Sequence, residues 1–160
     1  MSMLFEKCLP ERWEAKWIDP ELPHDKDQRQ PASVLRRRFT SKNAGNAVLY
    51  ITCHGLYEAV LNGVRVGDFV LAPGTGDYQK RLCVQAYDVS DLLREGENEL
   101  LVTLGDGWYR GSVGIDGLRN FYGEDIALLC QLELDGVPVL CSDERWEASH
   151  SSPTRENDLQ

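Results

Sequence analysis

The stretch IALLCQLELDGVPVLC, residues 126–141, predicts two β-strands joined by a tight turn. In its first half, apolar side chains occupy alternate positions and fall on one face of a strand: Ile126, Leu128, Cys130, Leu132 and Leu134. Gln131 and Glu133 fall on the other face, which is typical of a half-buried antiparallel strand. Asp135-Gly136 then supplies the two residues that adopt positive φ in a type I′ hairpin turn.

The same period of two recurs along the chain. AVLYITC, residues 47–53, alternates in the same way, and Asn62-Gly63 predicts a second hairpin. The second hairpin joins residues 56–61 to 64–70, and further strands are expected at residues 34–39, 84–87, 98–104 and 146–150. Many short strands with Gly-rich turns predict an all-β fold, an antiparallel β-sandwich of jelly-roll type with little helix.

The helical signal is confined to DVSDLLREGEN, residues 88–98. There Ser90 could cap a single turn that carries Leu92 and Leu93 and stops at Gly96. No long amphipathic helix is expected.

The 160 residues suit one domain with a core of its own. We assign residues 1–33 to an N-terminal extension and loop in which Trp13 and Trp17 act as anchors. Residues 34–150 form the predicted sandwich, and residues 151–160 a C-terminal tail or a linker to a further domain.

The charge of the chain argues against two classes of partner. A formal net charge of -9 opposes binding to nucleic acid and to anionic membranes, because both depend on clustered Lys and Arg. The basic run Arg36-Arg37-Arg38 lies inside a predicted strand, and we interpret it as solvent-facing and edge charges. No stretch approaches the length of a membrane span or a signal-peptide apolar region, so we expect a cytoplasmic protein.

The five cysteines form no CxxC pair, which favours neither a zinc site nor a disulfide framework. Cys53, Cys130 and Cys141 lie in apolar runs and are expected to be buried. No cofactor is expected, although a structural calcium ion held by turn carboxylates and carbonyls stays an alternative. The histidines are interpreted as solvated or capping residues rather than as part of a Ser/His/Asp triad: His24, His54 and His150.

GDGWYRG, residues 105–111, directly follows a predicted strand and contains glycines, charged residues and aromatic residues. It begins like a dinucleotide fingerprint, but Arg110 replaces the third glycine and no helix is expected to follow. Two interpretations stay open: Trp108 plugs the end of the sandwich with Tyr109 beside it, or the loop forms a surface facing a sugar or another domain. In both, Asp106 and Arg110 are expected at the surface.

Catalysis by paired carboxylates is not expected from this chain alone. Glycoside hydrolysis requires two carboxyl groups facing each other across a pocket, one of them with a pKa raised by burial. The 26 acidic residues cluster in turns instead, where they form a solvated rim.

Seven motifs in order along the chain resemble the N-terminal β-sandwich domain of bacterial α-L-rhamnosidases. They are AKWI at residues 15–18, LRRRF at 35–39, GLYEAVLNGVRVGD at 55–68, LAPGTGDYQKR at 71–81, YDVSDLLREGENEL at 87–100, LGDGWYRG at 104–111 and SDERWEAS at 142–149. The pair YDVSDLL and GENEL also resembles the sugar-binding sandwich of β-galactosidase-type hydrolases, a galactose-binding-like fold.

The resemblance implies a non-catalytic, carbohydrate-associated domain, since in rhamnosidases the catalytic acid and base belong to a later barrel of helices. The chain is therefore expected to be an excised domain of a larger enzyme, with a free-standing carbohydrate-binding module as the alternative. Its expected partner is a rhamnose-containing glycoside or the catalytic domain of the same parent chain. The candidate contact residues come from two motifs: Asp77, Tyr78, Asp106, Trp108, Tyr109 and Arg110.

Overall fold

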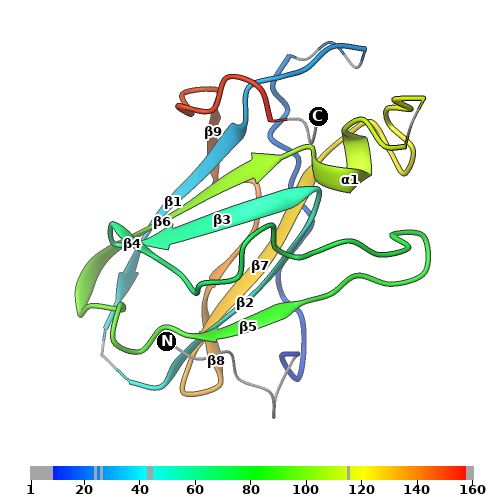
Figure 1. The fold of residues 1–160 in the computed structure, drawn as a ribbon. Helices are drawn as coiled ribbons and strands as arrows, with labels where there is room; N and C mark the ends of the chain where they lie inside the picture. Colours follow the sequence, from blue (N-terminus) through cyan, green and yellow to red (C-terminus); the bar gives the residue numbers. More distant parts are fainter. Residues whose placement is uncertain (1–8, 24, 26, 43–44, 115, 158–160) are drawn as a thin grey trace.

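Two antiparallel sheets pack face to face in the computed structural model, which describes residues 9–157 except 24, 26, 43–44 and 115 (Figure 1). The first sheet has the order β4 (Val64–Arg65), β3 (Leu56–Leu61), β6 (Gly96–Gly105), β1 (Ser33–Ser41), β9 (Glu147–Ser149). The second has the order β5 (Gln85–Asp88), β2 (Ala47–His54), β7 (Ala127–Leu134), β8 (Val137–Cys141). The predicted antiparallel β-sandwich is confirmed.

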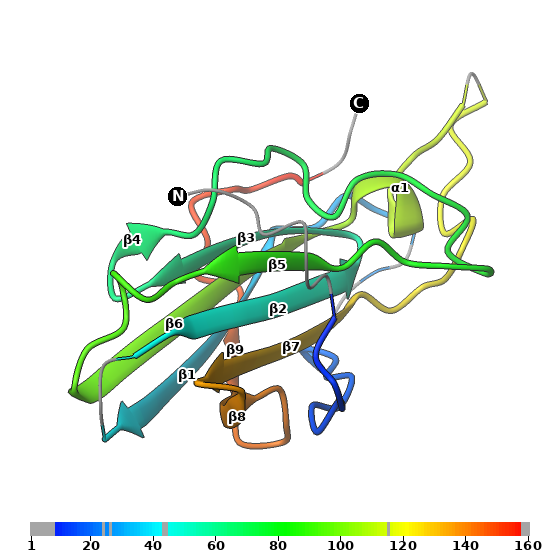
Figure 2. The same cartoon turned by 90° about the horizontal axis from the view of Figure 1, so that it is seen from below.

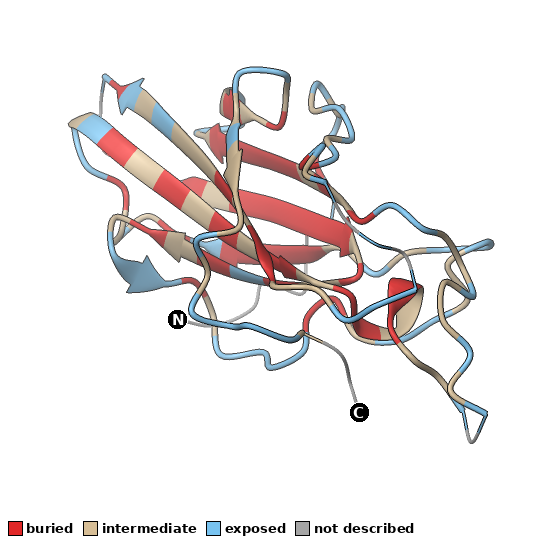
Figure 3. Ribbon diagram, turned by 90° about the horizontal axis from the view of Figure 1, so that it is seen from above, coloured by how far each residue is buried: buried red, intermediate tan, exposed pale blue. Residues whose placement is uncertain are grey.

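The core lies between the sheets and is built by the alternation seen in the sequence. Along β6, Leu100, Val102 and Leu104 are fully buried and the residues between them are half-buried (Figure 3). They meet side chains from the second sheet that are also fully buried: Leu49, Ile51, Cys53, Leu128, Cys130 and Leu132. Burial of these apolar side chains is the main favourable term in folding.

The outer face of β7 is covered as well, which differs from the half-buried strand expected. Gln131 is fully buried, because the N-terminal segment crosses over it. Its Oε1 accepts hydrogen bonds from the backbone N–H groups of Glu14 (2.7 Å) and Ala15 (3.2 Å), and its Nε2 donates to the Arg12 carbonyl (2.9 Å). A buried amide must have such partners, so this contact fixes the position of the N-terminal segment on the sheet.

Both predicted hairpin turns have type I′ geometry. The φ angles are 53° at Asn62 and 82° at Gly63, and 51° at Asp135 and 79° at Gly136. The strand after the first turn ends at Arg65, short of the predicted Val70, because Gly67 (φ 70°) redirects the chain.

The basic run does not lie at a sheet edge, so that expectation is wrong. Strand β1 is flanked by β6 and β9 (Figure 2), and its exposed charges find partners on those strands. Arg36 pairs with Glu147 (2.5 Å) and Arg38 with Glu99 (2.9 Å). A strand was expected at residues 146–150, and β9 forms within it, but its pairing with β1 is a long-range contact that no local pattern encodes.

Two local expectations also need correction. The residues after Asp88 form a single turn, in which the N–H groups of Leu92 and Leu93 donate to the Val89 carbonyl. Ser90 does not cap it, because its hydroxyl accepts the Ala47 N–H instead. A helical turn, α1 (Gly107–Arg110), forms in the motif where no helix was expected.

Cysteine burial follows the prediction for two of three residues. Cys53 and Cys130 are fully buried, whereas Cys141 is half-buried because it lies on the edge strand β8. Cys83 is exposed. None of the helices that the structure describes has the length and apolar character needed to cross a bilayer.

Candidate functional site

The turn α1 is organised by a buried ion pair. Strand β6 ends at Gly105, and Gly107 (φ 52°) then turns the chain against Leu56, where a Cβ would come within 2.6 Å of the Leu56 Cγ. One helical turn therefore places Arg110 above Asp106. The Arg110 Nε and Nη2 donate to the Asp106 Oδ1 at 2.9 and 2.6 Å, and Arg119 Nη2 donates to Oδ2 at 3.3 Å.

This arrangement contradicts the expected surface location of Asp106 and Arg110, which are only 0% and 4% exposed. An i, i+4 pair closed by a four-residue helix could not be foreseen in a segment predicted to be a turn. The two charges are structural, and they are not available to a ligand.

A stack of aromatic rings lies beside α1. The His54 imidazole, at the end of β2, is sandwiched between the indole of Trp17 (centroids 4.3 Å apart) and the ring of Tyr109 (4.6 Å). Burial between these rings lowers the pKa of His54, so the imidazole is neutral at pH 7. The interpretation of His54 as a solvated or capping residue is therefore wrong.

Three more rings extend the stack toward the loops. Tyr78 lies 5.3 Å from Tyr109 and 5.0 Å from Tyr122, and Phe121 lies edge-on to Tyr122 at 4.8 Å. Gly123 is required here, because a Cβ at this position would lie 2.4 Å from the Tyr109 hydroxyl oxygen. We call this set the aromatic row: Trp17, His54, Tyr109, Tyr78, Tyr122 and Phe121.

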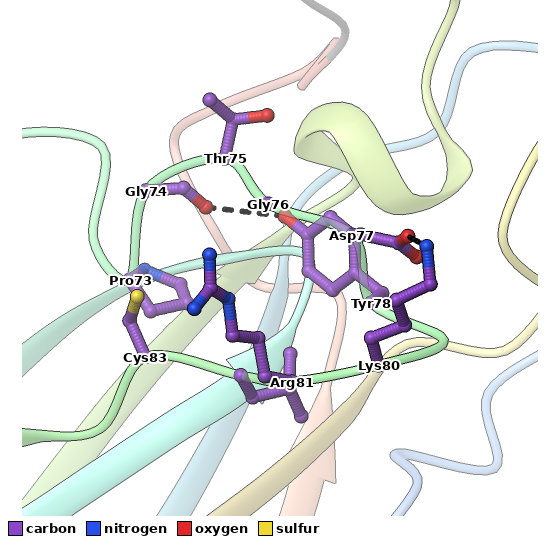
Figure 4. A pocket seen from close by; sticks show the side chains of 10 residues that line it. Pro73, Gly74, Thr75, Gly76, Asp77, Tyr78, Lys80, Arg81 and Cys83 are labelled. Carbon is purple, nitrogen blue, oxygen red and sulfur yellow. Dashed lines mark hydrogen bonds and ion pairs between the residues drawn. The ribbon is translucent and has the colours of Figure 1, made fainter.

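The loop of residues 73–83 encloses a hollow of about 540 Å³ next to the aromatic row (Figure 4). The Tyr78 hydroxyl donates to the Gly74 carbonyl (3.2 Å), and burial raises the pKa of Tyr78 to about 12. Asp77 pairs with Lys80 at 2.8 Å. The hollow therefore offers a neutral phenol, an aromatic ring, a paired carboxylate and the exposed guanidinium of Arg81.

The six predicted contact residues separate into three groups. Asp77 and Tyr78 line the hollow, and Tyr109 touches Tyr78 from α1. Asp106 and Arg110 form the buried ion pair at α1 and do not line the hollow. Trp108 is half-buried and does not belong to the core of the sandwich, which contradicts its interpretation as a core plug.

Sequence reasoning missed Trp17, His54 and Tyr122 as members of this site. They come from the N-terminal segment, β2 and the loop after α1, and only the closing of the sandwich brings them together (Figure 2). Trp17 was recognised as an anchor, but its partner could not be identified from spacing.

Within the described part of the chain, no group of three or more His, Cys, Asp or Glu side chains is arranged to hold a metal ion. The carboxyl groups whose pKa departs from the ordinary value have it lowered by hydrogen bonds, from Ser90 to Asp88, from Arg145 to Asp143 and from Arg36 to Glu147. Such carboxylates stay ionised, whereas a general acid needs a raised pKa.

A family model, protein sequences and solved structures all match this chain to α-L-rhamnosidases. Residues 42–159 match the family described as the α-L-rhamnosidase N-terminal domain. An α-L-rhamnosidase from Streptomyces avermitilis is 46% identical over 134 residues, which cover 80% of this chain and 13% of that protein. The crystal structure of the α-L-rhamnosidase from Aspergillus terreus matches with a TM-score of 0.85 at 40% identity, covering 91% of this chain and 17% of that chain.

A crystal structure of the Streptomyces avermitilis α-L-rhamnosidase complexed with L-rhamnose matches with a TM-score of 0.76 at 44% identity. The match covers 82% of this chain and 13% of that chain. The chain thus spans less than a fifth of the length of each of these relatives.

Proposed function

Because the chain belongs to the α-L-rhamnosidase N-terminal domain family, we propose that it is a non-catalytic accessory domain of an α-L-rhamnosidase. A separate domain of the same polypeptide would hydrolyse terminal α-L-rhamnosides. One observation carries the proposal: the match extends over most of this chain yet accounts for only 13% and 17% of the matched rhamnosidases.

The chemistry of the site supports this role. Hydrolysis of a glycoside uses two carboxyl groups about 5–9.5 Å apart, one of them protonated. Among the described residues that line the hollow there is one carboxylate, Asp77, and it is already paired with Lys80. The hollow is therefore suited to contact a ligand rather than to cleave it.

Activity of the purified chain toward an aryl α-L-rhamnoside tests the proposal. We expect no turnover by the 160-residue chain and turnover by a longer protein that contains it. Asp77→Asn in the longer protein should leave kcat within about twofold of the wild type, since Asp77 would touch no reacting atom. Turnover by the 160-residue chain that Asp77→Asn abolishes would overturn the accessory role.

We propose that the ligand bound in the hollow is a rhamnose-containing glycoside. The ring of Tyr78 can stack on the C–H face of a pyranose, while its hydroxyl oxygen and Arg81 offer an acceptor and donors to the sugar hydroxyls. Titration with L-rhamnose, followed by NMR, should shift resonances of residues 74–83, and Tyr78→Ala should weaken binding about tenfold or more. Val137→Ala, at an exposed apolar residue on β8 that does not line the hollow, is the control.

A further inference from the structure

The loop of residues 111–126 projects from the same end of the sandwich as the loop that encloses the hollow (Figures 1 and 2). It carries two large apolar side chains in solvent, Leu118 and Phe121, each 59% exposed. Single exposed apolar residues are common on proteins. These two are unusual because the backbone that bears them is fixed.

Hydrogen bonds hold this loop on both sides of Phe121. The Asn120 N–H donates to the Arg110 carbonyl (3.0 Å), and the Tyr122 N–H donates to the Tyr109 carbonyl (3.2 Å). Arg119 Nη2 donates to the buried Asp106 (3.3 Å) and to the Gln28 carbonyl (3.1 Å). The loop therefore cannot fold back to bury Phe121, and the ring is presented outward at one end of the aromatic row.

Asn157, near the C-terminus, lies at the base of the same loop. The Asn157 N–H donates to the Gln30 carbonyl (3.1 Å), two residues from the carbonyl that binds Arg119. The Asn157 Oδ1 accepts the Asp106 N–H (3.2 Å). In the family this domain is described as N-terminal, and it makes up 13% to 17% of the matched rhamnosidases, so the bulk of those proteins follows it.

We propose that Leu118 and Phe121 are the anchors of an interface with the domain that directly follows this one in the longer polypeptide. The inference rests on the proposed function, since it assumes a multidomain rhamnosidase. The partner surface would be an apolar pocket, because fixed apolar side chains projecting from a domain gain most from insertion into one. Trp17, 42% exposed at the other end of the aromatic row, lies outside the proposed interface.

Hydroxyl-radical labelling of the wild-type longer protein, read by mass spectrometry, tests this interface. Phe69 is the matched control, since it is the same residue type and is less exposed in this domain, at 44% against 59% for Phe121. We expect Phe121 to be labelled at least fivefold more slowly than Phe69, because the partner domain covers it. Labelling of Phe121 at the rate of Phe69 or faster would overturn the proposal.

Substitution gives a second, independent measurement in the same longer protein. Phe121→Ser should speed limited proteolysis between this domain and the next about tenfold, whereas Val137→Ser, at a 62% exposed residue on β8, should not. Equal proteolysis of both variants and the wild type would overturn the interface. Labelling and proteolysis do not depend on turnover, so a protein that shows the interface but hydrolyses no rhamnoside would contradict the proposed function alone.

Discussion

At the scale of single residues, Asp106 connects three parts of the molecule. Its carboxylate accepts hydrogen bonds from Arg110 and Arg119, and its N–H donates to Asn157. Arg110 in turn donates through Nη1 to the Glu124 carbonyl (3.3 Å). One fully buried carboxylate thus ties α1, the loop after it and the C-terminal segment together, and it stays buried because each oxygen has a charged donor.

Asp106→Asn should lower the free energy of unfolding by about 3–5 kcal/mol, because it leaves the buried Arg110 guanidinium without its counter-charge. Urea denaturation measures the change. Asp77→Asn is the control, since Asp77 pairs with an exposed Lys80 and such a pair contributes about 0–1 kcal/mol. Equal effects of the two substitutions would mean that the Asp106 pair does not stabilise the fold.

His54 should make stability depend on pH. Its pKa is lowered in the folded state, so between the folded and unfolded pKa values the unfolded chain binds more protons. The stability that neutral His54 contributes to the folded state is fully present above the ordinary histidine pKa of about 6.5, and it is lost as the pH falls below that value. His54→Phe, which keeps a ring between Trp17 and Tyr109, should flatten the fall in unfolding free energy between pH 7 and pH 5; an unchanged slope would rule out this origin.

At the scale of elements, two buried polar side chains join the sheets through the core. The Tyr57 hydroxyl on β3 donates to the Gln85 Oε1 on β5 (2.9 Å) and lies 3.3 Å from the Tyr87 hydroxyl. The Tyr87 ring packs against Gly67, just after the short strand β4. The turn at Gly67 that ends β4 thus lies against a ring of the opposite sheet.

Gly67→Ala should destabilise the protein more than Gly63→Ala. Both glycines have positive φ, 70° and 82°, so each substitution carries the left-handed penalty of about 1–2 kcal/mol. A Cβ at Gly67 would also lie 2.3 Å from the Tyr87 Cε1, whereas a Cβ at Gly63 would meet nothing within 4 Å. We expect a further loss of about 1–3 kcal/mol for Gly67→Ala in thermal or urea unfolding. Equal losses would show that Tyr87 moves aside freely.

At the scale of the whole molecule, the sequence was sufficient for the sandwich but not for the site. Strands and hairpins follow from local chemistry, as in the alternation along β7 and the positive φ at Asp135 and Gly136. The stack of Trp17, His54 and Tyr109 depends on distant segments meeting, which no local pattern encodes. Asp106 and Arg110 were misplaced for a different reason: charged residues in a Gly-rich turn are ordinarily exposed, and the helical turn that pairs these two was not expected.

The cysteines should report the cooperativity of the whole sandwich. Cys53 on β2 and Cys130 on β7 are fully buried on paired strands of the second sheet, and burial raises the pKa of both thiols. Cys83 is exposed in the loop at the hollow, so it should react with a thiol reagent at once.

Cys53 and Cys130 can react only when β2 and β7 separate, which requires opening of the entire core. We therefore expect native-state labelling of both, followed site by site by mass spectrometry, to be on the order of 10³-fold or more slower than labelling of Cys83. Their rates should also rise together with urea, with the slope of global unfolding. If either thiol reacted as fast as Cys83, or if the two rates responded differently to urea, the sheets would open separately and the sandwich would not unfold as one unit.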